Sequence, residues 1–305
     1  FCGIRIISEA MKGLGRPNLA VAVESLFLPA AVLVVLGFFV YSGGAVSTEI
    51  PVAVHAFCLL AVFALAVIFL LREKSRLDGV EPEYALPKVL FVGLLALWGG
   101  ALLNTLFLNL PFLLLPIVSS LDEIGGFSAA YRFFSITTVV LATVAATIGP
   151  RFASQYANRN AKGLRAELRR SQIASVVIYL PVFLVITVFS EDLLRMFGPD
   201  FHQAKPLIQL FALTQLLNAA TGLTGILLVM MGKEWLEFRI MAVTIVFTAA
   251  GIFWAGQVWG VYGATFAFCL GVVLKKLLSL LFCNWALNDF ENQNVVARVS
   301  ALARR

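Results

Sequence analysis

Residues 121–170 read LDEIGGFSAAYRFFSITTVVLATVAATIGPRFASQYANRNAKGLRAELRR, and this stretch decides the fold class. Its middle part, residues 133–150, is apolar and carries no charge, whereas six basic residues follow within the next twenty positions. An uncharged apolar segment of about 20 residues is long enough to cross a bilayer as a helix. Lys and Arg gather on the cytoplasmic side of membrane proteins. The stretch therefore predicts a transmembrane helix whose C-terminal end faces the cytoplasm.

The whole chain has the composition of a polytopic membrane protein. Of its 305 residues, 60% are hydrophobic and only 13% are charged, whereas a soluble domain carries about 25% charge. The net charge of +6 lies in short loops between apolar runs, so we interpret it as topology and expect no nucleic-acid partner. The sequence contains no Walker A motif, His-Glu-x-x-His motif or clustered Cys ligands. We therefore expect no metal, no cofactor and no enzymatic activity.

The uncharged runs predict an all-α bundle of eight complete transmembrane helices that follow one partial helix. A turn is expected at residues 256–260, and Pro111 and Pro116 are expected to end or bend the third span near Leu110. Twenty of the 23 Lys and Arg residues then fall on one side and three on the other, which places the C-terminus in the cytoplasm. The predicted spans are residues 20–42, 50–71, 88–110, 127–149, 171–190, 206–231, 236–256 and 261–287.

Polar stretches divide these helices into two groups. Residues 73–87 carry mixed charge and proline and predict a cytoplasmic linker between the groups. The basic segment 163–170 is expected to form an amphipathic helix on an anionic membrane surface. Because the chain starts inside an apparent helix, we also expect its N-terminal part to be incomplete. The expected divisions are the end of a first lobe (1–72), the linker (73–87), a second six-helix lobe (88–287) and a cytoplasmic tail (288–305).

Four short motifs resemble the multidrug/oligosaccharidyl-lipid/polysaccharide flippase superfamily. Their style is most similar to the polysaccharide-transporter branch, which includes the O-antigen flippases, and the resemblance covers essentially the whole chain. The motifs are GRPN at residues 15–18, GGFSAAYR at 125–132, IGPR at 148–151 and FSEDLLRMFGPDF at 189–201.

The resemblance implies a two-lobed, alternating-access transporter, commonly of twelve helices, of which this chain holds the end of the fourth and the next eight. It implies export of a polyprenyl-diphosphate-linked oligosaccharide, an O-antigen or other lipopolysaccharide or polysaccharide repeat unit, across the bacterial cytoplasmic (inner) membrane. Membrane lipids, a polysaccharide polymerase and chain-length proteins are the expected partners. Two alternatives stay open: a multidrug or cation antiporter of the same superfamily, and a membrane subunit of polysaccharide synthesis.

Arg132 is the first candidate for binding the diphosphate. It lies about five residues into its predicted helix, a depth of roughly 8 Å, and charges at such depth usually face a cavity or a partner. A guanidinium group forms paired hydrogen bonds with phosphate oxygens, and related flippases carry an arginine on this helix. The alternatives are that Arg132 reaches the external head groups or pairs with Asp122 or Glu123.

Five further charged residues, on other predicted helices, are candidates for lining the cavity or for ion coupling. Lys275 and Lys276 lie in the inner half of the last span, and adjacent helical residues point about 100° apart. We therefore expect one lysine to line the cavity and the other to reach the inner head groups. Arg5 is a further cavity candidate, although it can also pair with Glu9 four residues later. Glu9 and Glu24 are the candidates for ion coupling, with an interfacial acid as the alternative for Glu24.

Overall fold

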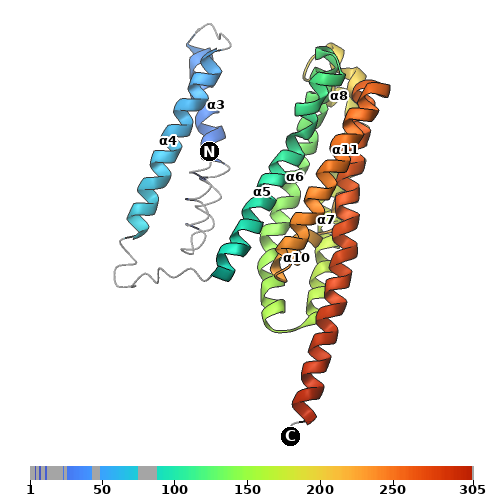
Figure 1. Cartoon of the computed structure of the whole chain (residues 1–305). Helices are drawn as coiled ribbons and strands as arrows, with labels where there is room; N and C mark the ends of the chain where they lie inside the picture. The colour runs from blue at the N-terminus through green and yellow to red at the C-terminus, as the bar shows by residue number, and fades with distance from the viewer. Residues whose placement is uncertain are drawn as a thin grey trace. The chain divides into compact units, whose positions relative to one another are not determined.

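The protein is helical wherever its structure is described. The computed structural model describes residues 4, 7, 11, 23, 26–42, 49–74 and 88–303. The predicted all-α fold is confirmed, because helices joined by short turns account for the described ranges. The chain divides into two compact units, Phe1–Ala85 and Leu86–Arg305, which are described separately below (Figure 1).

The first unit contains two described helices, α3 (Phe27–Tyr41) and α4 (Glu49–Lys74). The two helices pack against each other through small and branched apolar side chains, among them Leu28, Cys58 and Val62, which are all buried. Most of the other apolar side chains on these helices are exposed. An apolar surface of this kind suits contact with lipid.

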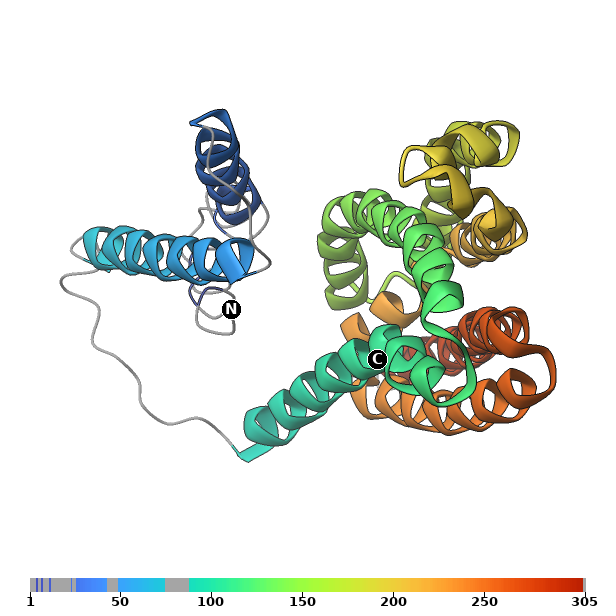
Figure 2. The ribbon, with the colours of Figure 1, turned by 90° about the horizontal axis from the view of Figure 1, so that it is seen from above.

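The second unit is a bundle of long helices. Figure 2 shows α5, in teal, lying against the two orange and red legs of α11. The helices are α5 (Lys88–Val118), α6 (Leu121–Ala157), α7 (Ala161–Val188), α8 (Ser190–Arg195), the 3-10 helix η1 (Pro199–Ala204), α9 (Lys205–Thr221), α10 (Thr224–Met230) and α11 (Glu234–Ala303).

The helix α11 consists of two legs that reverse direction at Trp259 and Gly260. Gly260 has φ 57° and ψ −142°, a conformation that glycine adopts readily because it has no Cβ. This is the turn expected at residues 256–260, so the first leg covers residues 234–258 and the second leg residues 261–303. Within the described residues, eight helical segments therefore lie at the eight predicted spans, α9 and α10 together forming one of them.

Five helical segments of the described chain are long and apolar enough to cross a membrane, by length and composition. The last of these segments, with 60 residues, includes both legs of α11, and Phe27–Tyr41 is a shorter apolar helix. The segments are Ile50–Phe69, Leu95–Val118, Ala161–Val188, Phe201–Met230 and Glu234–Gln293.

Of the two expectations for the prolines, that α5 ends or that it bends near Leu110, the first is wrong. The helix continues through Pro111 and Pro116 to Val118. A proline inside a helix removes one backbone hydrogen bond, and in membrane helices neighbouring groups can satisfy the carbonyls that it leaves. The Tyr131 hydroxyl donates a hydrogen bond of 2.6 Å to the Leu108 carbonyl, three residues before Pro111. This hydrogen bond ties α5 to α6 one turn before Pro111.

The basic segment 163–170 is helical, as expected, and is continuous with the rest of α7. It forms the first turns of α7, which starts directly after Asn160, and the Asn160 side chain accepts a hydrogen bond of 3.0 Å from Gly163 N. Leu164 and Leu168 are buried in a cluster with residues of α6, α10 and α11. These leucines face the bundle, whereas Arg169 and Arg170 of the same segment are exposed, so the segment is amphipathic.

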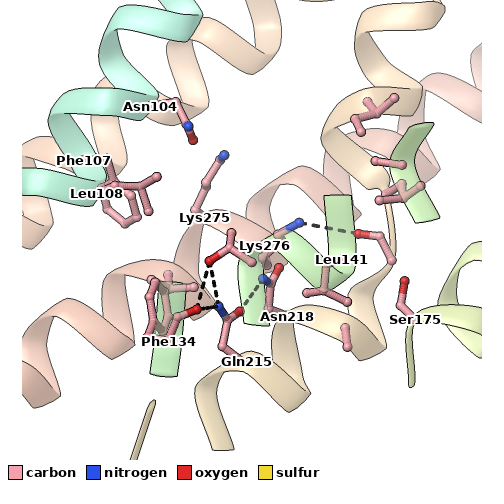
Figure 3. A pocket seen from close by; sticks show the side chains of 17 residues that line it. Asn104, Phe107, Leu108, Phe134, Leu141, Ser175, Gln215, Asn218, Lys275 and Lys276 are labelled. Carbon is pink, nitrogen blue, oxygen red and sulfur yellow. Dashed lines mark hydrogen bonds between the residues drawn. The ribbon is translucent and has the colours of Figure 1, made fainter. Parts of the chain in front are cut away.

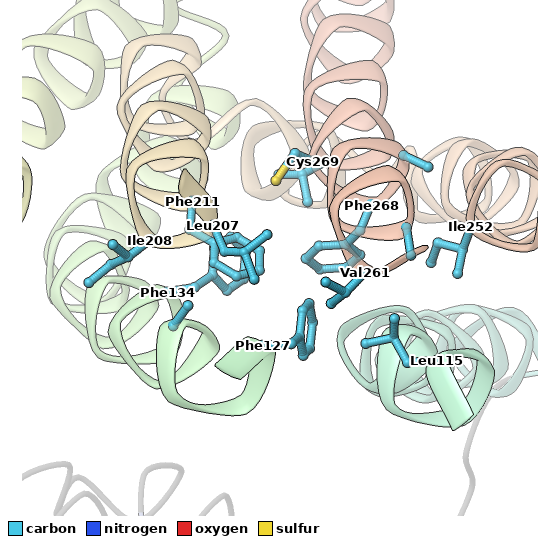
Figure 4. Close-up of a cluster of buried hydrophobic side chains, with 14 of the residues drawn as sticks. Leu115, Phe127, Phe134, Leu207, Ile208, Phe211, Ile252, Val261, Phe268 and Cys269 are labelled. Carbon is cyan, nitrogen blue, oxygen red and sulfur yellow. The ribbon is translucent and has the colours of Figure 1, made fainter. Parts of the chain in front are cut away.

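Aromatic side chains fill the centre of the second unit (Figure 4). Phe134, Phe211 and Phe268 come from α6, α9 and the second leg of α11, and their ring centroids lie 5.3 to 6.3 Å apart. Such distances are typical of favourable aromatic pairs. The cluster therefore joins three helices that are far apart in sequence. Phe134 also lines a cavity of the same unit, so the cluster adjoins that cavity.

We expect Gly271→Ala to destabilise the second unit. A Cβ at residue 271 would overlap the Thr248 side chain on the other leg of α11, and overpacking of this kind costs about 1–3 kcal/mol. Thermal unfolding in detergent measures the effect. The matched control is Gly100→Ala in α5, where an added Cβ has no neighbour within 4 Å. Equal melting temperatures for the two variants would contradict the close approach of the two legs.

Candidate functional site

A cavity of about 290 Å³ lies inside the second unit, where α5, α6, α7, α9, α10 and the second leg of α11 surround it. Figure 3 shows Gln215, Asn218, Lys275 and Lys276 close together, with apolar side chains such as Phe134 and Leu141 beside them. The polar side chains that line it are Asn104, Thr138, Ser175, Gln215, Asn218, Lys275 and Lys276.

Both predicted lysines line this cavity, so the expectation that only one does so is wrong. Lys275 and Lys276 are adjacent on α11 and point in different directions (Figure 3), and both are among the residues that line the cavity. The Lys275 Nζ lies 3.6 Å from an oxygen of Glu237, on the first leg of α11. The Lys276 Nζ donates a hydrogen bond of 3.5 Å to the Gly222 carbonyl. Each ammonium group thus contacts an acceptor from a different segment.

The Gly222 carbonyl can accept the hydrogen bond from Lys276 because the span formed by α9 and α10 is broken at Gly222. Gly222 has φ 68° and ψ −155°, and α9 ends at Thr221. The Ser171 hydroxyl accepts a hydrogen bond of 3.3 Å from Leu223 N, and Gln172 donates one of 3.5 Å to the Thr221 carbonyl. Helix α7 therefore satisfies part of the backbone that the break leaves open, and Lys276 satisfies another part from the cavity side.

Two amides on α9 complete the polar wall. Gln215 Nε2 donates to the Phe134 carbonyl at 3.0 Å and lies 3.4 Å from the Thr138 hydroxyl. Gln215 Oε1 accepts a hydrogen bond of 2.7 Å from Asn218. The Asn218 Oδ1 is buried and has no hydrogen-bond partner among the described residues. Because a buried polar atom without a partner is costly, this oxygen is available to a ligand or a water molecule in the cavity.

Glu237 is held in place on three sides. One carboxylate oxygen accepts a hydrogen bond of 2.9 Å from Ser279, and the other lies near Lys275. A Cβ added at Gly225 of α10 would come within 2.6 Å of the carboxylate, so this glycine leaves the space that Glu237 occupies. The side chains of Glu237 and Lys275 are only 17% and 18% exposed. The pair is therefore shielded from solvent more than a surface ion pair is.

Arg132 lies apart from the two lysines. Its guanidinium is 5.7 Å from the centroid of the Phe197 ring, its side chain is exposed, and it does not belong to the cavity lining. Glu123, one of its expected partners, hydrogen-bonds the N and the Oγ of Ser120 at 3.0 and 3.1 Å and so caps the start of α6. The structure thus brings Lys275 and Lys276 together and leaves Arg132 outside their cavity.

The remaining sequence candidates, Arg5, Glu9 and Glu24, lie outside the described residues. The sequence reasoning did not select Gln215, Asn218 or Glu237, which the structure places at or beside the cavity. One signal was present for the amides, because Gln215 and Asn218 are three residues apart in an apolar span and therefore lie on one helix face. No comparable signal existed for Glu237, since its contacts with Lys275 and Ser279 cross about 40 residues of sequence.

The arrangement can bind an anion. The two lysine ammonium groups can each donate hydrogen bonds to oxygens of one ligand. Apolar side chains surround these donors and lower the local dielectric constant, which strengthens their electrostatic attraction. Within the described residues no group of three or more His, Cys, Asp or Glu side chains could hold a metal ion.

Long apolar helices around a cavity that two lysines line are typical of multi-pass membrane proteins. The MatE family model matches residues 99–254, which is about half of the chain. The chain belongs to the MatE family, whose members are transporters. This confirms the coarser part of the resemblance, membership of the multidrug/oligosaccharidyl-lipid/polysaccharide superfamily.

One curated relative is named "Probable low-salt glycan biosynthesis flippase Agl15", from Haloferax volcanii. The two sequences are 24% identical over 159 residues, which cover 52% of this chain. The match spans about a third (34%) of that relative's own length.

Solved MATE structures share the fold. The structure described as MATE in complex with MaL6 has a TM-score of 0.77 and 13% identity, over 95% of this chain and 67% of that one. An outward-facing conformation of a multidrug resistance MATE family transporter has a TM-score of 0.71 and 13% identity, over 94% and 66%. At such low identity, this likeness establishes the fold and leaves the substrate open.

Proposed function

We propose that this protein is a flippase that moves a polyprenyl-diphosphate-linked oligosaccharide across the cytoplasmic membrane by alternating access. The observation that carries this proposal is the pair Lys275 and Lys276, which line one cavity inside a membrane bundle. A diphosphate linked on both sides carries two negative charges and several acceptor oxygens. Two positively charged ammonium groups can balance these charges and donate hydrogen bonds to the oxygens. The similarity to a probable glycan biosynthesis flippase supports the same substrate class.

The proposed transport cycle places the two units in different lobes. We infer that residues 88–287 form the second lobe and that residues 73–87 connect it to the first. We also infer that the C-terminus is cytoplasmic, because 20 of the 23 basic residues lie on that side. The oligosaccharide would then enter from the cytoplasm with its diphosphate at the lysines, while the polyprenyl chain stays in lipid. An O-antigen or other polysaccharide repeat unit fits this route, with a polymerase acting on the exported product.

Reconstitution of the intact protein in liposomes tests the proposal. The substrate is a fluorescent undecaprenyl-diphosphate-linked sugar, and its transfer between leaflets is followed by quenching from outside. We expect transfer in the presence of the protein and none in protein-free liposomes. Transport of the cationic dye ethidium, without transfer of the lipid-linked sugar, would overturn the proposal in favour of a multidrug or cation antiporter.

Arg132 is proposed as a second diphosphate contact, used on the other side of the membrane. We expect Arg132→Ala to abolish flipping at an unchanged amount of protein in the membrane, because the substrate then loses a paired hydrogen-bond donor on its path. The control is Arg195→Ala, which removes an exposed arginine from α8. Full complementation of a flippase-deficient strain by the Arg132→Ala variant would contradict this role.

A further inference from the structure

We infer that Glu237 is an internal substitute for the substrate's phosphate: it neutralises Lys275 in the empty transporter and loses this contact when an anionic phosphate group binds. This inference rests on the proposed function and adds a residue that sets the affinity of the site. It makes Glu237 and the substrate competitors for one ammonium group.

The first support is the weakness of the existing contact. The Lys275 Nζ and the Glu237 oxygen are 3.6 Å apart, whereas a charge-assisted hydrogen bond between such groups is typically about 2.7–2.9 Å long. The exposed pair Lys205–Glu191 of the same protein reaches 2.6 Å. Lys276 is also held loosely, at 3.5 Å from a carbonyl. Neither lysine is therefore committed to its internal acceptor, and a phosphate oxygen that comes closer to Lys275 forms the stronger contact.

The second support is that Glu237 keeps a partner after Lys275 leaves. Ser279 donates to the second carboxylate oxygen at 2.9 Å, and Gly225 leaves room for the carboxylate on the opposite side. The carboxylate is thus retained in its position by α10 and the second leg of α11. The exchange requires only a movement of the Lys275 side chain, which has four rotatable bonds.

The third support is the cost of the empty state. Two ammonium groups in a largely apolar cavity, without a counter-charge, carry a large desolvation penalty. Glu237 reduces this penalty when no substrate is present, so that the empty transporter can return to the cytoplasmic side. The same carboxylate weakens substrate binding, because the phosphate must displace it. A transporter needs such moderate affinity, since a substrate that is bound too tightly is not released.

Binding of farnesyl diphosphate to the purified, intact protein tests the inference, with farnesol as the probe that lacks the diphosphate. We expect Glu237→Gln to bind farnesyl diphosphate about tenfold more tightly than the wild type, which corresponds to about 1.4 kcal/mol. We also expect this variant to flip the lipid-linked sugar more slowly. Ser279→Ala keeps the carboxylate but removes the partner that Glu237 retains when Lys275 leaves, so it should weaken binding of farnesyl diphosphate by about two- to threefold. This opposite shift tests the inference if Glu237→Gln does not fold.

The matched control is Glu234→Gln, the same charge change one helical turn away on the same helix. It should leave the affinity unchanged, which separates competition at Lys275 from a general electrostatic effect. Equal affinity of Glu237→Gln and wild type, or weaker binding by Glu237→Gln, would overturn the inference while wild-type binding still supports the proposed function. If the wild type binds farnesyl diphosphate no better than farnesol, the proposed function itself fails and the inference fails with it.

Discussion

Protein that carries Lys275→Gln together with Lys276→Gln is expected to lose at least about 100-fold in affinity for farnesyl diphosphate and to lose flipping activity. Each ammonium group can form a hydrogen bond to a charged oxygen, worth about 1.5–3 kcal/mol, and a loss of 1.4 kcal/mol corresponds to a factor of ten. Glutamine is a suitable replacement because it keeps a polar donor and removes only the charge and part of the length. Titration of the purified protein with farnesyl diphosphate measures the loss.

The single variants should differ from each other. Lys275→Gln removes one donor and also leaves the Glu237 carboxylate without its nearby cation, so it should weaken binding more than Lys276→Gln does. Addition of Glu237→Gln to Lys275→Gln should recover part of the affinity, because the repulsion between carboxylate and phosphate is then absent. Such non-additivity is expected for residues that interact directly.

Lys233→Gln is the control for these lysine variants. Lys233 lies just before α11, with its Nζ 5.5 Å from the centroid of the Trp285 ring, and it is not part of the cavity lining. Its removal changes the charge of the protein by the same amount and should leave diphosphate binding unchanged. If the double lysine variant bound farnesyl diphosphate as the wild type does, the cavity would not be the diphosphate site.

Gly222→Ala is expected to unfold or inactivate the second unit. Gly222 lies in the left-handed region with φ 68°, where an L-residue is strained by about 1–3 kcal/mol. In addition, an added Cβ would lie 2.7 Å from the Gln172 Cγ and 2.8 Å from the Ser171 Oγ. Overpacking of this kind costs about 1–3 kcal/mol more. The expected result is a melting temperature far below that of the wild type, with loss of transport in any folded fraction.

Gly232→Ala separates backbone strain from overpacking, the two contributions to the expected destabilisation by Gly222→Ala. Gly232 also has a positive φ, 72°, but an added Cβ there has no neighbour within 4 Å. It should therefore show only the conformational strain and melt between the wild type and Gly222→Ala. Equal melting temperatures for the two glycine variants would mean that α7 does not pack closely against the break between α9 and α10, contrary to the contacts of Ser171 and Gln172.

The broad fold could be predicted from the sequence because hydrophobic runs and loop charges are local signals. Long uncharged runs such as residues 133–150 indicated transmembrane helices, and the turn of α11 at Gly260 lies where the sequence predicted it. The helix limits were less certain. Pro111 did not end α5, which continues to Val118, because a membrane helix tolerates proline where neighbouring helices pack against it. Leu164 and Leu168 of the basic segment 163–170 pack into a core cluster.

The sequence by itself determined that this protein is an all-helical membrane protein, and its loop charges and motifs indicated the transporter superfamily. The tertiary structure decided which polar groups meet. It placed Lys275 and Lys276 on one cavity, brought Glu237 to Lys275 from the other leg of α11, and left Arg132 apart. The physical reason is that burial in a bilayer is a property of each segment, whereas a contact between Glu237 and Ser279 depends on how two distant segments pack.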